Sequence, residues 1–144
     1  MIITKNKKTV IVMPNEPTPR ECFAAAELAA YLKNICGVCA QQSRVPVENA
    51  NLFYIGGPGR NAAADQIVSA EVFQKALDKA EGIYIETKGD AVLLAGSVGF
   101  DDEQRGTVYA VYEFLERFLG CSFAAYSKPG VFAGELVPKF ESLT

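Results

Sequence analysis

The sequence predicts an α+β domain in which helices pack on a mixed β-sheet. Two long amphipathic segments, residues 19–36 and 105–119, have the apolar spacing of helices that cover a sheet. Between them, residues 82–87 and 91–96 are rich in apolar strand formers and flank the turn Lys88-Gly89-Asp90, a pattern typical of a hairpin. The predicted order of elements is β-α-β-α-β-β-α-β, and no internal repeat is visible.

Five runs are predicted to form strands, because each combines β-branched, aromatic or aliphatic residues with turn residues at its ends. The run at 91–96 (AVLLAG) has no polar alternation, so we expect it to be buried on both faces. The polar residues 41–51 are expected to form a loop. The predicted strands are residues 9–13, 52–56, 82–87, 91–96 and 121–126.

The first helix has strong signals at both ends. Thr18 is a suitable N-cap, Pro19 suits the first helical position, and Glu21 can complete a capping box. We expect the helix to run to about Cys36 and to stop at Gly37. Its apolar stripe should face the sheet, and consists of Ala25, Leu28, Leu32 and Ile35, with Ala24 and Tyr31 beside it.

Further helices are predicted downstream. A short helical piece follows Asn61, and Ser69 can cap a helix that continues through Leu77. The segment 105–121 (RGTVYAVYEFLERFLGC) predicts the second long helix, which ends at Gly120. Most of its aromatic residues are therefore assigned to the core, along the apolar positions Val108, Val111, Tyr112, Leu115, Phe118 and Leu119.

Composition excludes several classes of function. The chain has 144 residues, a formal net charge of −3 and no histidine. The missing histidine removes Ser-His and Cys-His nucleophile pairs, the commonest general base and most catalytic zinc sites. No basic surface of the kind that nucleic acid requires is indicated, and Lys5, Lys7 and Lys8 are expected to form a solvated edge.

The sequence indicates no membrane partner, because no run approaches the roughly 20 apolar residues that cross a bilayer. Residues 1–13 do not have the long apolar run of a signal peptide. A periplasmic or secreted location is expected if a leader has been removed, and the compartment is otherwise open.

The four cysteines are predicted to be small buried thiols. Cys36 and Cys39 have the CxxC spacing, but Cys36 ends a helical pattern, where the helix dipole disfavours a thiolate. Neither Cys22 nor Cys121 supplies the second ligand pair of a zinc knuckle. No metal or cofactor is therefore expected.

Three polar clusters are also given structural assignments. The loop 56–60 (GGPGR) lacks the lysine and hydroxyl residue of a P-loop, so it is predicted to be a tight turn with Arg60 in solvent. The acids at 101–103 are expected to favour a helix N-terminus rather than to bind calcium. Glu113 and Glu116 are expected to be solvated rather than to form a glycosidase acid pair.

Several aromatic residues could stack on a sugar ring if they are exposed, although core packing is the expected role of each. They are Tyr54, Tyr84, Phe100, Tyr109, Phe123 and Tyr126.

Two segments resemble the N-terminal domains that precede glycoside hydrolase barrels. Residues 21–37 (ECFAAAELAAYLKNICG) resemble their AA-EL--YL--ITG helix, and residues 105–121 resemble their RGT-YAVYEFLE--LGC helix. The IGG strand end and the GIYIETKGDAVLLAG hairpin lie between them in the same order, so the resemblance covers most of residues 9–125. The families are the family 67 α-glucuronidases and family 20 β-hexosaminidases. The closest similarity is to the version in uncharacterised glycoside-hydrolase-like proteins of Bacteroides-type bacteria.

The resemblance implies a zincin-like α+β fold without zinc or catalytic residues, since chemistry in those families belongs to the following (β/α)8 barrel. Residues 1–144 would then be one noncatalytic accessory domain, with 128–144 as an extended tail toward the missing barrel. The expected partner is that C-terminal barrel of the same polypeptide, and the full-length protein would be a glycoside hydrolase. An independent carbohydrate-binding module with exposed aromatic residues is the alternative.

The chain departs from the pattern of these families at two places. Cys36 stands where threonine is usual, and residues 122–124 (SFA) replace a common Arg-Trp. The loop 99–105 is expected to lie nearest the barrel, with Arg105 paired to an aspartate. The candidates for a ligand or domain interface are Phe100, Asp101, Asp102, Arg105 and Tyr126.

Overall fold

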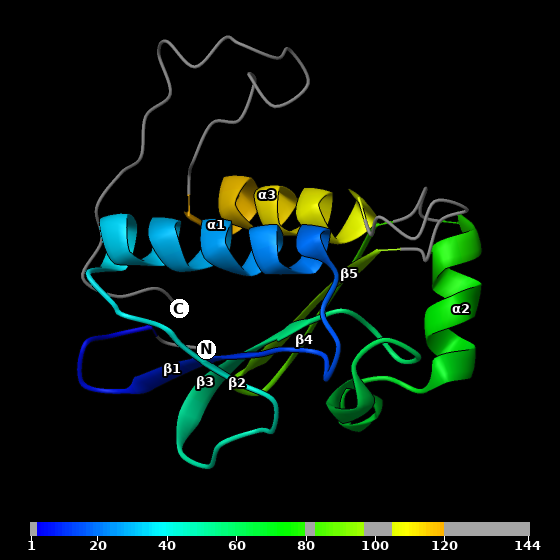
Figure 1. Cartoon of the computed structure of the whole chain (residues 1–144), viewed down its shortest axis with the longest axis horizontal. Helices are drawn as coiled ribbons and strands as arrows, with labels where there is room; N and C mark the ends of the chain where they lie inside the picture. Colours follow the sequence, from blue (N-terminus) through cyan, green and yellow to red (C-terminus); the bar gives the residue numbers. More distant parts are fainter. Residues whose placement is uncertain (1–2, 80–82, 97–104, 120–144) are drawn as a thin grey trace, which may run out of the picture.

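The structure, a computed structural model, describes residues 3–79, 83–96 and 105–119. Within these ranges the chain forms a five-stranded mixed sheet with helices packed on it, which confirms the predicted class (Figure 1). The elements are β1 (Lys8–Val12), α1 (Pro19–Cys36), β2 (Gln41–Ser43), β3 (Ala50–Ile55), η1 (Ala62–Gln66), α2 (Ala70–Lys79), β4 (Ile83–Lys88), β5 (Ala91–Gly96) and α3 (Arg105–Leu119).

The strand order across the sheet is β2-β1-β3-β5-β4. The first four strands in this order are parallel, and β4 joins β5 as the predicted antiparallel hairpin. Every residue of β5 is buried, as expected for a strand covered on both faces.

The predicted loop at 41–51 is wrong in part. Residues 41–43 form the edge strand β2, in which Val10 of β1 pairs with Gln41, and β3 begins at Ala50 rather than at 52. Gln41-Gln42-Ser43 has no apolar alternation, because an edge strand has little of its surface in the core. Its pairing with β1 is a tertiary contact that no local pattern indicates.

Helix α1 has the predicted ends. The Thr18 side chain accepts a hydrogen bond from the Glu21 amide, and the Glu21 side chain accepts one from the Thr18 amide, so the capping box is complete. Gly37 ends the helix in the left-handed region (φ 69°) that favours glycine. Ser69 likewise caps α2, since its hydroxyl accepts from the Val72 amide.

The helices α1 and α3 lie side by side on one face of the sheet, and both run from the end where the parallel strands finish (Figure 1). Because side chains alternate along each strand, one set from β1, β3 and β5 meets these helices. Phe53 and Phe114 pack edge-to-face there, with ring centroids 5.4 Å apart. This core includes Ile11, Phe53, Ile55, Val92 and Leu94 from the sheet with Ala25, Leu28, Leu32, Ile35, Val108, Val111, Phe114 and Leu115 from the helices.

On the opposite face of the sheet, residues of η1 and α2 join the strands in a second core. Phe73 of α2 packs edge-to-face on Tyr84 of β4, with ring centroids 5.1 Å apart. The Phe73 ring also lies so close to Gly57 that a Cβ added there would be 2.3 Å from it. This second core includes Val10, Val12, Tyr54, Leu93 and Ala95 with Ala64, Val68 and Phe73.

Candidate functional site

The carboxyl ends of β1, β2, β3 and β5 meet at one edge of the sheet, which we call the carboxyl edge. Open α/β sheets bind their ligands at such an edge, at the point where the strand order reverses. Here the reversal lies between β1 and β3, since the chain moves outward from β1 to β2 on one side and from β3 to β5 on the other. The loops after β1 and β3 therefore form the first place to look for a site.

Asn61 fills the crevice between these two strand ends. Its side chain is 1% exposed, and its amide nitrogen donates to the carbonyl oxygens of Val12 (2.9 Å) and Ile55 (3.0 Å). Its carbonyl oxygen accepts from the Ala63 amide and caps η1. One side chain thus satisfies the last carbonyls of both strands, so the crevice holds protein groups in the position that a ligand takes in other α/β folds.

A buried ion pair lies beside Asn61. The carboxylate of Glu21 is fully buried and accepts from Arg60 Nη2 at 2.6 Å and from Arg60 Nε at 3.3 Å. The same carboxylate accepts from the Thr18 amide at 2.8 Å, while Arg60 Nη2 also donates to the Glu16 carbonyl at 3.0 Å. The pair joins the loop after β3 to the N-terminus of α1.

The prediction that Arg60 lies in solvent is therefore wrong. Its side chain is 26% exposed and is held in a forked contact with a carboxylate 39 residues earlier in the chain. The capping box was visible in the sequence, but the second partner of Glu21 was not, because capping is local and the ion pair forms only when the two loops meet.

A second arginine holds the loop after β1 from the other side. Arg44, directly after β2, donates through Nη1 to the carbonyl oxygens of Pro14 and Asn15. Arg44 and Arg60 therefore both bind backbone carbonyls of the segment 14–16. The loop between β1 and α1 is fixed by two guanidinium groups and by the capping box.

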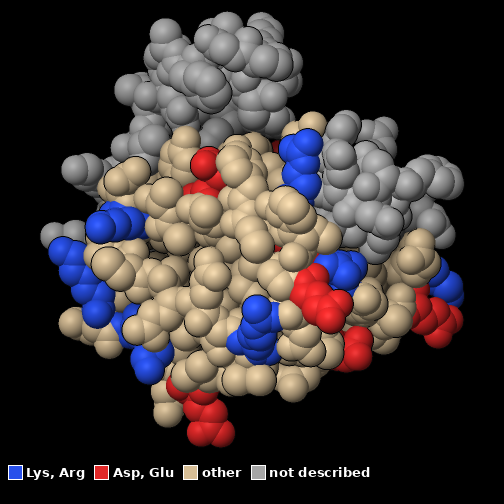
Figure 2. Space-filling model, viewed as in Figure 1, with Lys and Arg blue, Asp and Glu red and all other residues tan. Residues whose placement is uncertain are grey.

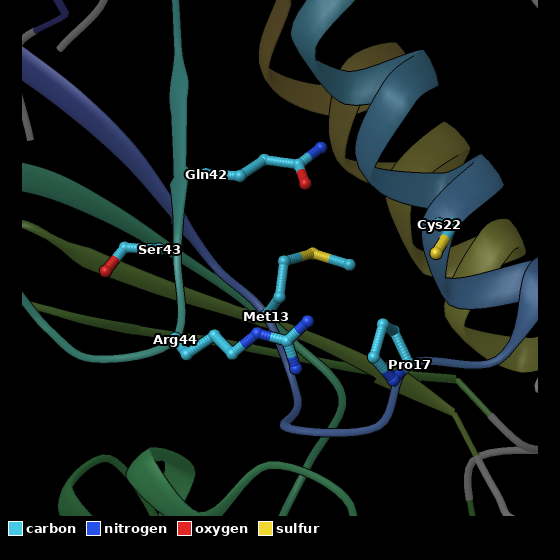
Figure 3. A pocket seen from close by; sticks show the side chains of 6 residues that line it. All are labelled: Met13, Pro17, Cys22, Gln42, Ser43 and Arg44. Atoms are coloured by element: carbon cyan, nitrogen blue, oxygen red, sulfur yellow. The ribbon is translucent and has the colours of Figure 1, made fainter.

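Two hollows flank this network. One, of about 240 Å³, lies between β2 and α1 and is lined by Met13, Pro17, Cys22, Gln42, Ser43 and Arg44 (Figure 3). In Figure 3 Gln42 points toward α1, the Cys22 sulfur faces the hollow, and the Ser43 side chain points away. The other, of about 540 Å³, is polar and is lined by Asn15, Glu16, Gly59, Arg60, Ala62 and Asp65.

The cysteine predictions are right for only one of the described thiols. Cys36 is buried, and burial raises the pKa of its thiol above the ordinary value, which keeps it protonated. Cys22 and Cys39 are exposed, because Cys22 lies off the apolar stripe of α1 and Cys39 follows the end of that helix. Cys121 lies outside the described residues.

The aromatic candidates separate by exposure. Tyr54 is buried, and burial raises the pKa of its hydroxyl, whereas Tyr84 is half-buried against Phe73. Tyr109 on α3 is 43% exposed, and so is available at the surface. Phe23 on α1 is also exposed, at 46%. The sequence did not indicate this, because the residues that follow Phe23 are apolar as well and do not mark which side of the helix faces solvent.

The candidates for a ligand or domain interface lie mostly outside the described residues. Phe100, Asp101, Asp102 and Tyr126 are in segments of which nothing is described, so their roles stay predictions. Arg105 is the first residue of α3. Because α3 follows β5, it begins at the carboxyl edge. Residues 99–104 lie outside the described residues, so the expectation that the loop 99–105 lies nearest the barrel stays a prediction.

Other expected sites can be checked only in part. Glu113 is half-buried and Glu116 is exposed on α3. No group of three histidine, cysteine or acidic residues close enough to hold a metal ion occurs within residues 3–79, 83–96 and 105–119. Across the same ranges, no helix has the length and apolar character required to cross a membrane.

Comparison with known proteins identifies one shared fold. No protein-family model matches the chain, and no curated protein matches its sequence. Among solved structures, the chain is similar to part of BtGH115A, described as a family GH115 4-O-methyl-α-glucuronidase with specificity for decorated arabinogalactans. The TM-score is 0.70 at 17% sequence identity, and the match covers all of this chain but 17% of that one. The chain thus has the fold of one segment of a much longer glycoside hydrolase.

Proposed function

We propose that this chain is a noncatalytic accessory domain of a carbohydrate-active protein, where it packs against and supports a glycosidase-like barrel of the same polypeptide. The fold likeness to one segment of BtGH115A supports the connection with glycoside hydrolases. The single observation that carries the noncatalytic role is the filled crevice at the carboxyl edge.

The polar groups at that crevice are engaged in holding loops. The Asn61 amide nitrogen donates to two strand carbonyls, the Glu21 carboxylate accepts three hydrogen bonds, and Arg44 donates to two backbone carbonyls. A general acid or base must be able to reach the proton that it transfers. Glu21, enclosed by Thr18 and Arg60 with no exposed surface, is suited to structure instead.

The finer assignment is the domain that precedes the barrel in family 67 α-glucuronidases and family 20 β-hexosaminidases, with a zincin-like fold that lacks the metal centre. BtGH115A belongs to a third family, GH115, but shares the α-glucuronidase description with family 67. Arg105, together with Phe100, Asp101, Asp102 and Tyr126, is proposed to face the barrel, because α3 begins at the carboxyl edge.

Turnover by the isolated chain tests this function. We expect no hydrolysis of a panel of 4-nitrophenyl glycosides, including the α-glucuronide, above a no-protein control. A glycosidase active on each substrate serves as the positive control, and circular dichroism checks that the chain is folded. Hydrolysis that survives purification to homogeneity and disappears in a Glu113→Gln or Glu116→Gln variant would contradict the proposal.

A carbohydrate-binding module is the second candidate, because two aromatic side chains are exposed on adjacent helices. Tyr112 of α3 donates a hydrogen bond to Glu27 of α1 (3.4 Å), and the two helices run in the same direction. Tyr109 and Phe23 each lie about one turn before this contact, so they are on the same end of the helix pair. Glycan-array binding that is lost in Tyr109→Ala and in Phe23→Ala would favour this candidate.

A further inference from the structure

A groove rich in lysine lies at the edge of the sheet opposite the carboxyl edge. Its volume is about 490 Å³, and we call it the lysine groove. It lies where β1 begins and α1 ends, at the end of the molecule where Figure 2 shows Lys and Arg side chains gathered (left in the view). Its lining consists of Lys5, Lys7, Lys8, Thr9, Gly37, Val38, Cys39 and Gln41.

The charge of the lysine groove is only partly neutralised. Lys7 forms an ion pair with Asp90, and the hydrogen bond from Lys7 lowers the pKa of the Asp90 carboxyl. Lys5 and Lys8 are exposed and form no ion pair within the described parts of the chain. No carboxylate is among the lining residues above, so the groove keeps a local positive charge although the whole chain carries −3.

The end of α1 accounts for part of this charge but not for all of it. Lys33 lies in the last turn, and Lys5 lies against the C-cap Gly37. The helix dipole favours cations at both positions, because the C-terminal end of a helix is partly negative. That dipole corresponds to about half a negative charge. With Lys7 paired to Asp90, Lys5 and Lys8 still exceed it, and Lys8 belongs to β1 rather than to the helix end.

Thr9 gives a second, independent indication of a ligand. Thr9 is one of the residues that line the groove and is 1% exposed, and its hydroxyl has no hydrogen-bond partner among the described residues. A buried hydroxyl without a partner destabilises the folded state, because it has lost its hydrogen bonds to water. A bound oxygen acceptor that reaches this hydroxyl would satisfy it.

The chemistry favours an acidic sugar over nucleic acid. Sites for single-stranded nucleic acid add aromatic platforms for base stacking to their basic groups, whereas the lining of the groove has no aromatic side chain. Lysine ammonium groups with a threonine hydroxyl and the Gln41 amide offer donors to a carboxylate or sulfate and to sugar hydroxyls. We propose that the lysine groove binds a carboxylate- or sulfate-bearing glycan chain; this inference rests on the proposed connection with carbohydrate.

Isothermal titration of the whole chain with oligogalacturonate at low salt tests the proposal. We expect Lys5→Gln combined with Lys8→Gln to weaken binding roughly tenfold, and added salt to weaken it further because exposed charges are screened. The matched control is Lys75→Gln combined with Lys88→Gln, which removes the same charge from exposed positions on α2 and β4 and should leave affinity unchanged. Lys7 is kept in both variants so that its pair with Asp90 stays intact.

Thr9→Val separates a ligand contact from a structural role. The substitution removes the hydroxyl at nearly constant volume, so the free energy of unfolding should stay the same or rise while affinity for oligogalacturonate falls several-fold. Equal affinity for neutral dextran, tighter binding of inorganic phosphate or duplex DNA, or no loss in the Lys5/Lys8 variant would overturn the proposal. Turnover of glycosides by the chain would instead contradict the accessory function, so the two failures are distinguishable.

Discussion

At the scale of single residues, the Arg60–Glu21 ion pair is the contact on which the carboxyl edge depends most. The carboxylate has no exposed surface, so removal of the guanidinium leaves a buried charge without its partner. We expect Arg60→Met to lower the free energy of unfolding by about 3 kcal/mol in urea titrations. Arg60→Lys should have a smaller effect, because it keeps the charge but loses the forked geometry.

Two further variants make this prediction specific. Combining Arg60→Met with Glu21→Met should recover part of the loss, since the orphaned carboxylate is removed as well. Lys75→Met breaks the exposed pair with Glu71 on α2 and should change stability by less than about 1 kcal/mol. Equal losses in the free energy of unfolding for Arg60→Met and Lys75→Met would show that the buried pair stabilises the fold no more than an exposed pair does.

The hydroxyl of Tyr84 gives a prediction for pH. Burial, its hydrogen bond to Glu86 and the charge of that carboxylate together raise its pKa to about 12. The folded state therefore holds a proton that the unfolded state releases near pH 10. Stability from this residue is complete below pH 10 and is lost as the pH rises toward 12.

Near-ultraviolet absorbance of tyrosinate measures this titration. The titration that disappears in Tyr84→Phe belongs to Tyr84, and we expect its midpoint near pH 12. Glu86→Gln should lower the pKa of Tyr84 but leave it above 10, since burial remains. Ionisation of Tyr84 near pH 10 in the folded chain would contradict the described burial.

At the scale of elements, the loop after β3 packs directly against helix α2, so a larger side chain in the loop would clash with the helix. Gly57 faces the Phe73 ring so closely that even a methyl group cannot be added without movement. We expect Gly57→Ala to destabilise the fold by about 1–3 kcal/mol because the site is already filled. Phe73→Leu should relieve the clash, so the two substitutions should be non-additive in a double-mutant cycle.

Gly59 provides the matched control for this cycle. It has open space around the added Cβ but a φ of 95°, so Gly59→Ala acts only through backbone strain. Its effect should add to that of Phe73→Leu. Coupling of equal size at Gly57 and Gly59 would show that the ring contact is not the cause.

The sequence predicted correctly those elements that have capping or turn residues at their ends. Helix α1 begins and ends as predicted because Thr18, Glu21 and Gly37 act within one turn of their own positions. Strand β2 was missed because Gln41–Ser43 is defined by its partner β1 and not by its own composition. The same reason applies to Arg60, whose partner lies on another element.

At the scale of the whole molecule, strand order predicts a gradient of stability across the sheet. The strands β3 and β5 each have neighbours on both sides, whereas β2 is a three-residue edge. The Leu52 amide donates to Asp90 in the turn before β5, and the Gly56 amide donates to Leu94 of β5. The Met13 amide donates to Ser43 of β2. Edges open locally more readily than interior strands.

Hydrogen exchange measured by NMR tests this gradient. We expect the amides of Leu52 and Gly56 to exchange at least about tenfold more slowly than that of Met13, because their exchange requires opening of the central strands. Slower exchange at Met13 would mean that β2 is held more firmly than its three-residue length indicates.

The sequence by itself determined the α+β class, both long helices, the hairpin and the burial of β5. These features follow from spacing, capping and turn residues that act over a few positions. Only the tertiary structure decided the parallel strand order, the edge strand β2, the Asn61 contact with two strand ends and the partner of Arg60. Each of these joins residues far apart in the chain, and such pairs are selected by how the packed layers meet rather than by any neighbouring residue.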